Sequence, residues 1–214
     1  MTLEYWRGRF VEAGRMWGEQ PSDITVHAAD DFGRRGVRSV LVAGCGYGRN
    51  AVFLSKMGYE VRGVDFCPEA LELADEFTAQ QACDTCYTLA DTLDLPFPDA
   101  SFDGVFSVNL LHVLNARERP QALQEWRRVL RRGGVLCLAV LALGDPSCGQ
   151  GAEVEENTFA RPGHHSTHFF SEGELRGLLS EFNVEAITGL SEEESHADGE
   201  RHIHRLLYAV ATVE

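Results

Sequence analysis

The stretch Val40–Asp65, VLVAGCGYGRNAVFLSKMGYEVRGVD, decides the fold of this protein. It begins with an apolar run whose length and β-branched content are typical of a strand buried in a parallel sheet. A glycine turn, Gly44–Gly48, follows, and Arg49–Met57 then repeats apolar residues with the period of a helix. A second strand is predicted over Tyr59–Val64 and ends at Asp65. Strand, glycine turn, helix, strand and carboxylate are the order of a nucleoside-binding βαβ unit.

The spacing of this unit indicates which nucleoside it binds. Asp65 follows Gly44 by about 20 residues, the separation expected for a carboxylate that binds ribose hydroxyls. The glycines read GxGxG, and Arg49 stands where the dinucleotide fingerprint GxGxxG has its last glycine. This departure disfavours NAD and FAD, because their pyrophosphate needs the close helix–strand approach of the longer motif.

The sequence AGCGYGRN followed by GVD resembles motif I and the acidic residue of class I S-adenosylmethionine-dependent methyltransferases. S-adenosylmethionine (SAM) has no phosphate, and its carboxylate can lie near a helix N-terminus, which favours an anion. The resemblance implies that Asp65 binds both ribose hydroxyls and that Tyr47 or Trp17 lies near the sulfonium through cation–π attraction. It assigns cofactor contacts in this stretch to Gly44, Cys45, Gly46, Tyr47, Asn50, Asp65 and Phe66.

Two later segments extend the resemblance. A third strand is predicted over Cys86–Ala90, and Asp91 and Thr92 follow it. In the family, an aspartate at this place accepts a hydrogen bond from the adenine amine, for which a carboxylate is a strong acceptor. A fourth strand over Gly104–Val108 is followed by Asn109, at the strand edge where open α/β sheets bind ligands. The resemblance adds Asp91, Thr92 and Asn109 to the predicted cofactor site.

The run EWRRVLRRGGVLCLAVL resembles a late segment of the same family. Its pattern predicts a helix over about Pro120–Leu130, stopped by Gly133-Gly134 after a cluster of arginines. A buried fifth strand is predicted over Val135–Leu143. With this run, the resemblance covers about residues 37–143.

The last third of the chain is predicted to form a loop, a helix and the final strands of the sheet. Residues 144–166 are polar and glycine-rich, and we interpret them as a long loop that forms a lid over the acceptor pocket. Ser171 is predicted to cap a helix that ends near Leu179. Strands at about 182–190 and 203–213 are joined by too few residues for a helical crossover, so we expect them to be antiparallel. The predicted fold is α/β, a doubly wound Rossmann-like sheet of seven strands, mostly parallel with the last strand antiparallel.

The length of 214 residues predicts a single methyltransferase domain over 1–214. Its parts are an N-terminal helical lid segment (1–35), a SAM-binding core (36–143), and an acceptor-side loop with the C-terminal strands (144–214). The first part is rich in aromatic residues, and the string around Trp17 resembles a segment of tellurite-resistance-like methyltransferases that lies over the cofactor. The alternative is that these aromatics only cap the core.

The amino-acid composition of the chain limits the kinds of molecule that it is expected to bind. The chain carries 19 basic and 33 acidic residues, a formal charge of −14, which disfavours nucleic acid as the substrate because phosphate affinity comes from Lys and Arg. No signal-peptide core is seen near the N-terminus, and the longest apolar run is far below the ~20 residues that span a bilayer. We therefore expect a cytoplasmic protein, a monomer or homodimer with no membrane partner, and mainly thiol cysteines. Cys83 and Cys86 form a lone CxxC pair, so no metal is predicted.

The sequence does not single out a catalytic residue. His112, His164 and His168 are candidates, because a neutral imidazole can take a proton from an acceptor near pH 7. For each of them, a hydrogen-bonded structural role is the open alternative. The predicted function is methyl transfer from SAM to a small-molecule acceptor through O, N, S or a metalloid, with S-adenosylhomocysteine (SAH) as product. The alternatives are a SAM-binding protein without catalysis and an NAD-dependent oxidoreductase.

Overall fold

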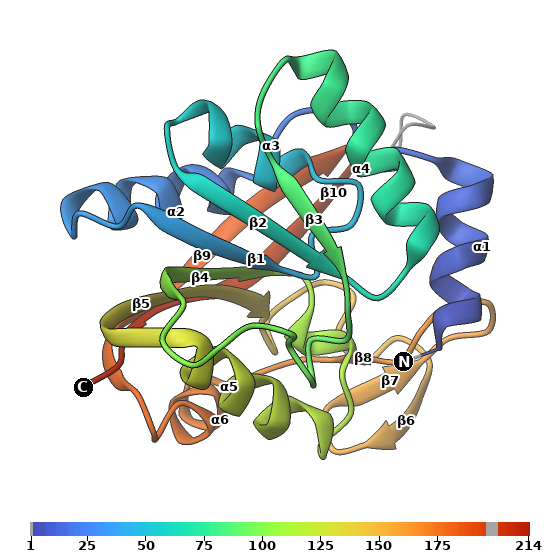
Figure 1. The fold of residues 1–214 in the computed structure, drawn as a ribbon. Coiled ribbons are helices and arrows are strands. Elements are labelled where there is room, and N and C mark those ends of the chain that lie inside the picture. Colours follow the sequence, from blue (N-terminus) through green and yellow to red (C-terminus); the bar gives the residue numbers. More distant parts are fainter. Residues whose placement is uncertain (1, 196–200) are drawn as a thin grey trace.

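The protein folds around one mixed β-sheet, seen in a computed structural model that describes residues 2–195 and 201–214. β10 runs antiparallel to both of its neighbours, and the pairs among the first five strands are parallel. The predicted seven-stranded sheet with its last strand antiparallel is therefore confirmed within these ranges. In spatial order the strands are β3 (Cys86–Leu89), β2 (Glu60–Asp65), β1 (Ser39–Ala43), β4 (Phe102–Val108), β5 (Leu130–Leu141), β10 (Arg201–Thr212) and β9 (Asn183–Ser195) (Figure 1).

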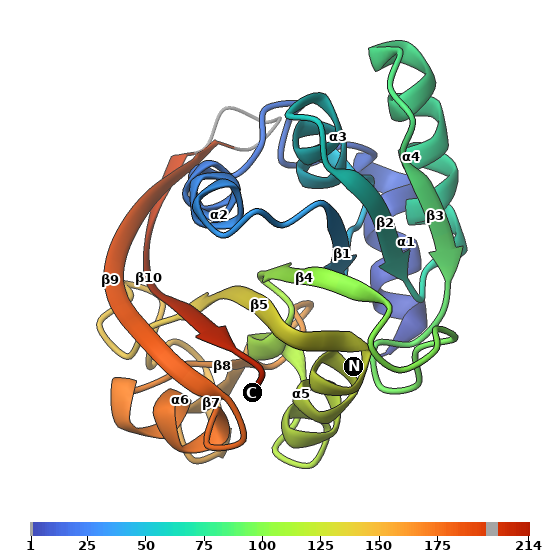
Figure 2. The same cartoon turned by 60° about the vertical axis from the view of Figure 1, so that its left-hand side comes forward.

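Helices cover both faces of the sheet. α2 (Asp23–Arg34), α3 (Arg49–Lys56) and α4 (Pro68–Gln81) lie on one face, and α5 (Glu118–Val129) and α6 (Glu172–Leu178) on the other (Figure 2). Successive side chains of a strand point to opposite faces. Accordingly, Val40 and Val42 of β1 pack into the cluster under α2 and α3, and Leu41 and Ala43 into the cluster under α5.

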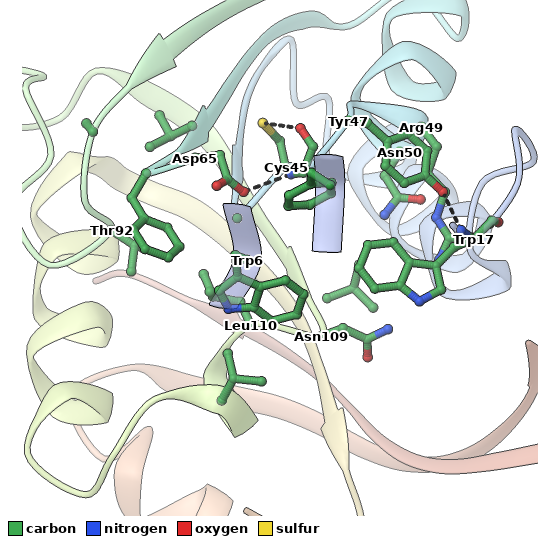
Figure 3. Close-up of a pocket in the computed structure, with 18 of the residues that line it drawn as sticks. Trp6, Trp17, Cys45, Tyr47, Arg49, Asn50, Asp65, Thr92, Asn109 and Leu110 are labelled. Atoms are coloured by element: carbon green, nitrogen blue, oxygen red, sulfur yellow. Dashed lines mark hydrogen bonds between the residues drawn. The ribbon is translucent and has the colours of Figure 1, made fainter. Parts of the chain in front are cut away.

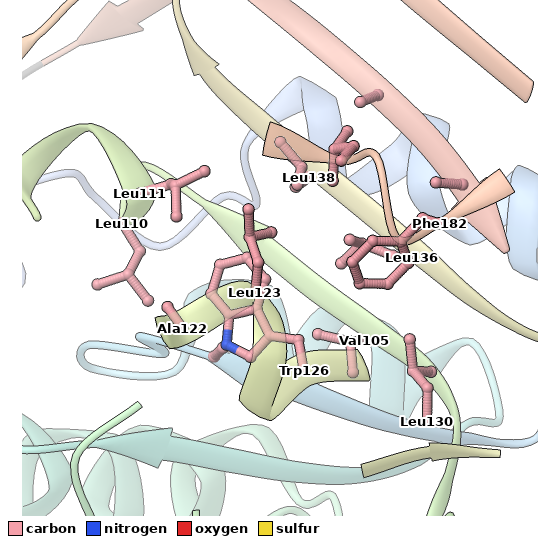
Figure 4. Packing of buried hydrophobic residues seen from close by; sticks show 14 of the residues in the cluster. Val105, Leu110, Leu111, Ala122, Leu123, Trp126, Leu130, Leu136, Leu138 and Phe182 are labelled. Atoms are coloured by element: carbon pink, nitrogen blue, oxygen red, sulfur yellow. The ribbon is translucent and has the colours of Figure 1, made fainter. Parts of the chain in front are cut away.

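The cluster on the α5 face is centred on Trp126, whose side chain is fully buried among leucines of α5, β5 and the segment after β4 (Figure 4). Its indole Nε1 donates a hydrogen bond of 2.8 Å to Thr92 Oγ1. A buried N–H without a partner is costly, so this bond stabilises both residues. The loop after β3 is thereby fastened to the hydrophobic core.

The predicted boundary between α5 and β5 was wrong. α5 ends at Val129 and β5 begins at Leu130, so that Gly133 and Gly134 lie inside the strand instead of stopping the helix. Leu130 is buried and pairs with Phe102 of β4. Gly133 has a φ of +73°, and the register of β4 against β5 shifts nearby. The tertiary pairing therefore extends the strand through a pair of residues that usually end a helix.

The predicted structureless loop over 144–166 was also wrong. The segment holds the strands β6 (Ala152–Glu155) and β7 (Thr158–Ala160), which join β8 (Thr167–His168) in a small antiparallel sheet, named the β6–β8 sheet below. The strands were not predicted because the segment is polar. All four residues of β6 are exposed, so the sequence shows no buried apolar face there.

The N-terminal segment is helical, as predicted, with a break before Pro21. α1 (Leu3–Ala13) packs beside α4, where Arg7 Nε lies 2.6 Å from Glu69 Oε1 (Figure 1). A short 3-10 helix, η1 (Leu111–Val113), follows β4. None of the helices in the described ranges is long and apolar enough to cross a membrane.

Candidate functional site

A pocket lies at the carboxyl ends of β1, β2, β3 and β4, and residues of α1 cover it (Figure 3). This is the edge where open α/β sheets bind ligands. Every residue assigned to the cofactor from the sequence lines this one pocket, although cofactor binding itself stays a prediction. These residues are Trp17, Gly44, Cys45, Gly46, Tyr47, Asn50, Asp65, Phe66, Asp91, Thr92 and Asn109.

The glycine turn after β1 needs its glycines. Gly44, Gly46 and Gly48 all have positive φ values, of +68°, +52° and +83°, which side chains with a Cβ rarely adopt. A Cβ on Gly44 would lie 2.9 Å from Leu110 Cδ2, and one on Gly48 would overlap the Tyr87 hydroxyl. The turn therefore presents bare backbone to the pocket.

Asp65 at the end of β2 is fixed against this turn. Its Oδ2 accepts the Gly46 N–H at 2.9 Å and its Oδ1 accepts the Cys67 N–H at 3.0 Å. Burial raises the pKa of Asp65, and the backbone N–H groups of Cys67 and Gly46 oppose that rise by stabilising the carboxylate. A carboxylate has about four lone-pair sites, so these two bonds leave capacity for a pair of hydroxyl donors.

The loop after β3 forms the far end of the pocket. Asp91 is exposed, and its Oδ1 accepts the Leu93 N–H at 3.0 Å. Thr92 is buried, and its hydroxyl oxygen is the acceptor for Trp126 described above. The Thr92 hydroxyl is therefore engaged by Trp126, and Asp91 is the side chain of this loop that can accept a hydrogen bond from an amine.

Tyr47 joins the segment after α1 to the glycine turn. Its hydroxyl donates to the Gly18 carbonyl at 2.8 Å and accepts the Trp17 N–H at 3.1 Å. The Tyr47 and Trp17 rings are stacked, with centroids 5.9 Å apart and an interplanar angle of 16°. Arg49 donates to the Trp17 carbonyl at 2.8 Å. The indole of Trp17 is thus held at the pocket wall (Figure 3).

Two asparagines complete the polar lining. Asn50 Oδ1 accepts the Ser22 N–H at 3.0 Å and the Thr25 hydroxyl at 2.8 Å, which ties α3 to the start of α2. Asn109 follows β4 with a φ of +59°, in the left-handed region that asparagine tolerates better than most residues. The Asn50 side chain is therefore held in place by the fold around the pocket.

Residues of α1 and η1 that were not predicted from the sequence also line the pocket. Trp6 and Phe10 come from α1, and Leu110 and Val113 flank the centre of η1. The Trp6 ring packs against His165, with centroids 5.1 Å apart. The aromatic density of the N-terminal segment was the available signal for Trp6 and Phe10, and the sequence carried none for the residues of η1.

The three histidine candidates for a general base do not fall among the described residues that line the pocket. His168 is buried, its Nδ1 lies 2.7 Å from Thr158 Oγ1, and its Nε2 lies 2.8 Å from Glu174 Oε1. Both of its nitrogens are therefore engaged in joining the β6–β8 sheet to α6, which favours the structural role that the sequence left open for His168. His164 is exposed.

His112 is the third candidate, at the centre of η1. Its side chain is 6% exposed, and burial lowers its pKa to about 3. The imidazole is neutral at pH 7, but a group with so low a pKa is a weak base. His112 therefore suits hydrogen bonding better than proton abstraction.

Comparison with known proteins finds a methyltransferase domain over residues 41–138, from β1 into β5. The O-methyltransferase resE of Aspergillus sclerotiorum is 33% identical over 151 residues, which are 65% of this chain and 56% of that protein. The 27-O-demethylrifamycin SV methyltransferase of Amycolatopsis mediterranei is 31% identical over 140 residues, 64% of this chain and 51% of that protein. The chain spans about half the length of these curated relatives.

Solved structures share the fold. A protein described for the conversion of a disulfide bond into a thioacetal group during echinomycin biosynthesis has a TM-score of 0.80 and 21% identity, covering 99% of this chain and 93% of its own. The 1,6-didemethyltoxoflavin-N1-methyltransferase of Burkholderia thailandensis, with its substrate and SAH bound, has a TM-score of 0.66 and 22% identity. That match covers 99% of this chain and 88% of the other.

Proposed function

We propose that this chain, which contains a methyltransferase domain over residues 41–138 and shares its fold with SAM-dependent methyltransferases, transfers a methyl group from SAM to a small-molecule acceptor. The observation that carries the proposal is the Asp65 carboxylate, fixed by the Gly46 N–H in the same pocket as Asp91. A ribose-binding carboxylate, a bare glycine turn and an acceptor for the adenine amine are the groups that a sulfur nucleoside requires.

The charges of the pocket fit SAM better than a dinucleotide. Its described charged side chains are Asp65, Asp91 and Arg49, and the guanidinium of Arg49 is bonded to the Trp17 carbonyl. Two carboxylates attract a sulfonium, whereas the pyrophosphate of NAD would be repelled by them. This balance supports SAM over the oxidoreductase alternative.

The residues of this chain would contribute to the reaction by aligning SAM with the acceptor. SAM supplies a methyl group that is already activated by its positive sulfur. Asp65 would hold the ribose, Asp91 the adenine amine, and the Gly44–Gly48 backbone the methionine end. Fixing two reactants in near-attack geometry supplies about 7–11 kcal/mol of a barrier. The aromatic cover from α1 excludes water from the same space.

For the acceptor atom we favour a hydroxyl oxygen. The support is that resE, with which 65% of this chain aligns, is named an O-methyltransferase, and that the rifamycin relative is named for a 27-O position. A SAM-binding protein without catalysis is the second candidate, because no histidine among the described lining residues stands ready as a base.

Calorimetric titration tests the cofactor. SAM and SAH are expected to bind the wild-type protein and NADH is not, and Asp65→Asn is expected to weaken SAH binding at least tenfold. Asp103→Asn is the matched control, because Asp103 is also buried and accepts two backbone N–H groups, from Arg38 and Ser39, but lies at the opposite edge of the sheet. Binding of NADH in place of SAH would contradict the proposal.

Catalysis needs a separate measurement. Protein and methyl-labelled SAM are incubated with small-molecule extracts, and labelled products are separated by chromatography. A labelled product that is absent with Asp65→Asn supports an enzyme. SAH binding without any labelled product would favour the non-catalytic alternative.

A further inference from the structure

The pocket has two halves of different chemistry. The first half lies at the ends of β1, β2 and β3, and holds the carboxylates and the glycine turn described above. The second half is built by α1, the segment after it, the end of β4 and η1. Its apolar lining residues are Trp6, Phe10, Trp17, Val108, Leu110 and Val113.

The charged side chains among the described lining residues are Asp65, Asp91 and Arg49. Of these, Arg49 reaches the second half, where its guanidinium donates to the Trp17 carbonyl and lies 5.9 Å from the centroid of the Trp17 ring. A carboxylate on an acceptor would face two protein carboxylates on a chain of charge −14. An ammonium group would be repelled by the sulfonium and by the Arg49 guanidinium beside Trp17. Burying a charge without a partner is costly, so the second half suits a neutral molecule.

Aromatic rings dominate this half. The Trp6 ring has its centroid 6.1 Å from that of Phe10 and 6.3 Å from that of Trp17. The Trp6 ring also packs against His165, with centroids 5.1 Å apart, and the His165 ring lies 5.3 Å from that of Tyr5 between centroids. Rings at such distances favour offset or edge-to-face packing with a further planar ring.

Three buried polar atoms at the margin of this half have no hydrogen-bond partner among the described residues. They are Trp6 Nε1, His112 Nδ1 and His165 Nδ1. His112 lies between the lining residues Leu110 and Val113, and His165 lies against the lining residue Trp6. A buried polar group without a partner costs about 1–3 kcal/mol. A polar substituent on a ligand would remove part of that cost.

From these observations, and resting on the proposed function, we propose that the methyl acceptor is a neutral, planar aromatic molecule that carries a hydroxyl group. It packs against Trp6 in the apolar half of the pocket. His165, from the segment that joins β7 to β8, is a positioning residue that holds the Trp6 indole through their ring contact. The β6–β8 sheet thereby shapes the acceptor pocket through one ring contact.

Binding of three probes to the SAH-saturated protein tests the acceptor class. The probes are 2-naphthol, its saturated counterpart decahydro-2-naphthol, and 2-naphthoate, which share a bicyclic skeleton and differ in planarity or charge. We expect 2-naphthol to bind at least tenfold more tightly than the other two in calorimetric titrations. Equal affinity of the three probes, or no binding of 2-naphthol, would overturn the inference.

Variants of His165 test the positioning role. His165→Ala is expected to weaken 2-naphthol binding about tenfold, whereas His165→Phe, which keeps a ring against Trp6, stays within threefold of wild type. SAH affinity stays within twofold in both, which also shows that they are folded. Ser166→Ala is the control, because the neighbouring Ser166 is exposed and its substitution is expected to change nothing. If His165→Phe binds as weakly as His165→Ala, the ring contact is not what positions Trp6.

The two proposals fail in different ways. Wild-type protein that does not bind SAH overturns the proposed function and this inference with it. Protein that binds SAH but does not discriminate among the three probes retains the proposed function and loses only the acceptor class.

Discussion

Replacing Tyr47 by phenylalanine is expected to loosen the cover of the pocket. Tyr47 is 1% exposed, and its hydroxyl makes two hydrogen bonds to the segment after α1, one to the Gly18 carbonyl and one from the Trp17 N–H. The substitution removes one oxygen and keeps the ring that stacks on Trp17. Any effect therefore reports on the two hydrogen bonds.

The magnitude follows from the bonds lost. A hydrogen bond in a protein contributes about 1 kcal/mol net, so Tyr47→Phe should lower the free energy of unfolding by about 2 kcal/mol. If the Trp17 segment instead detaches in the folded protein and must be reordered on binding, the same energy weakens SAH affinity by up to about 30-fold. Urea unfolding and SAH titration together measure both outcomes.

Tyr59→Phe is the matched control. The Tyr59 hydroxyl donates one hydrogen bond, of 2.7 Å, to the Ala29 carbonyl, away from the residues that line the pocket. We expect it to lose about 1 kcal/mol of stability and to bind SAH as wild type does. Tyr47→Phe with wild-type stability and wild-type SAH affinity would refute the reasoning that Tyr47 fastens the cover.

Three further predictions concern the pocket, the turn and a buried histidine. Asp91→Ala should weaken SAH binding about tenfold by titration with little change in stability, because Asp91 is exposed; unchanged affinity would remove it from the adenine site. Gly48→Ala should cost more stability in urea than Gly14→Ala, because both have positive φ but only Gly48 would press a Cβ on Tyr87; equal losses would contradict this. His112 has its pKa lowered to about 3, against about 6.5 unfolded, so between these values the unfolded chain binds a proton that the native chain does not. The free energy of unfolding should therefore fall as the pH falls below 6.5, and His112 should account for about 2 kcal/mol of that fall at pH 5. Unfolding of wild type and of His112→Gln at pH 7 and pH 5 measures this, because the variant should lack the part of the fall that His112 causes.

Much of the fold was predictable because the patterns that encode it are local. The apolar run before Gly44, the helical period of α3 and the capping of α6 by Ser171, whose Oγ accepts the Glu174 N–H, each depend on residues within a few positions. The boundary at Gly133 failed because pairing of Leu130 with Phe102 acts between distant parts of the chain. The β6–β8 sheet was missed because its strands are short and exposed.

By itself the sequence determined the glycine turn and the ends of the first strands, since positive φ at glycine and a carboxylate at a strand end are set by adjacent residues. Only the tertiary structure decided what covers that turn. Trp6 and His165 are far apart along the chain, and nothing in either segment indicates that their rings meet. It also decided the contacts of His168, which pairs with Thr158 and Glu174 once the β6–β8 sheet and α6 have packed together. Local patterns set backbone conformation, whereas contacts between distant side chains exist only once the layers of the fold have packed together.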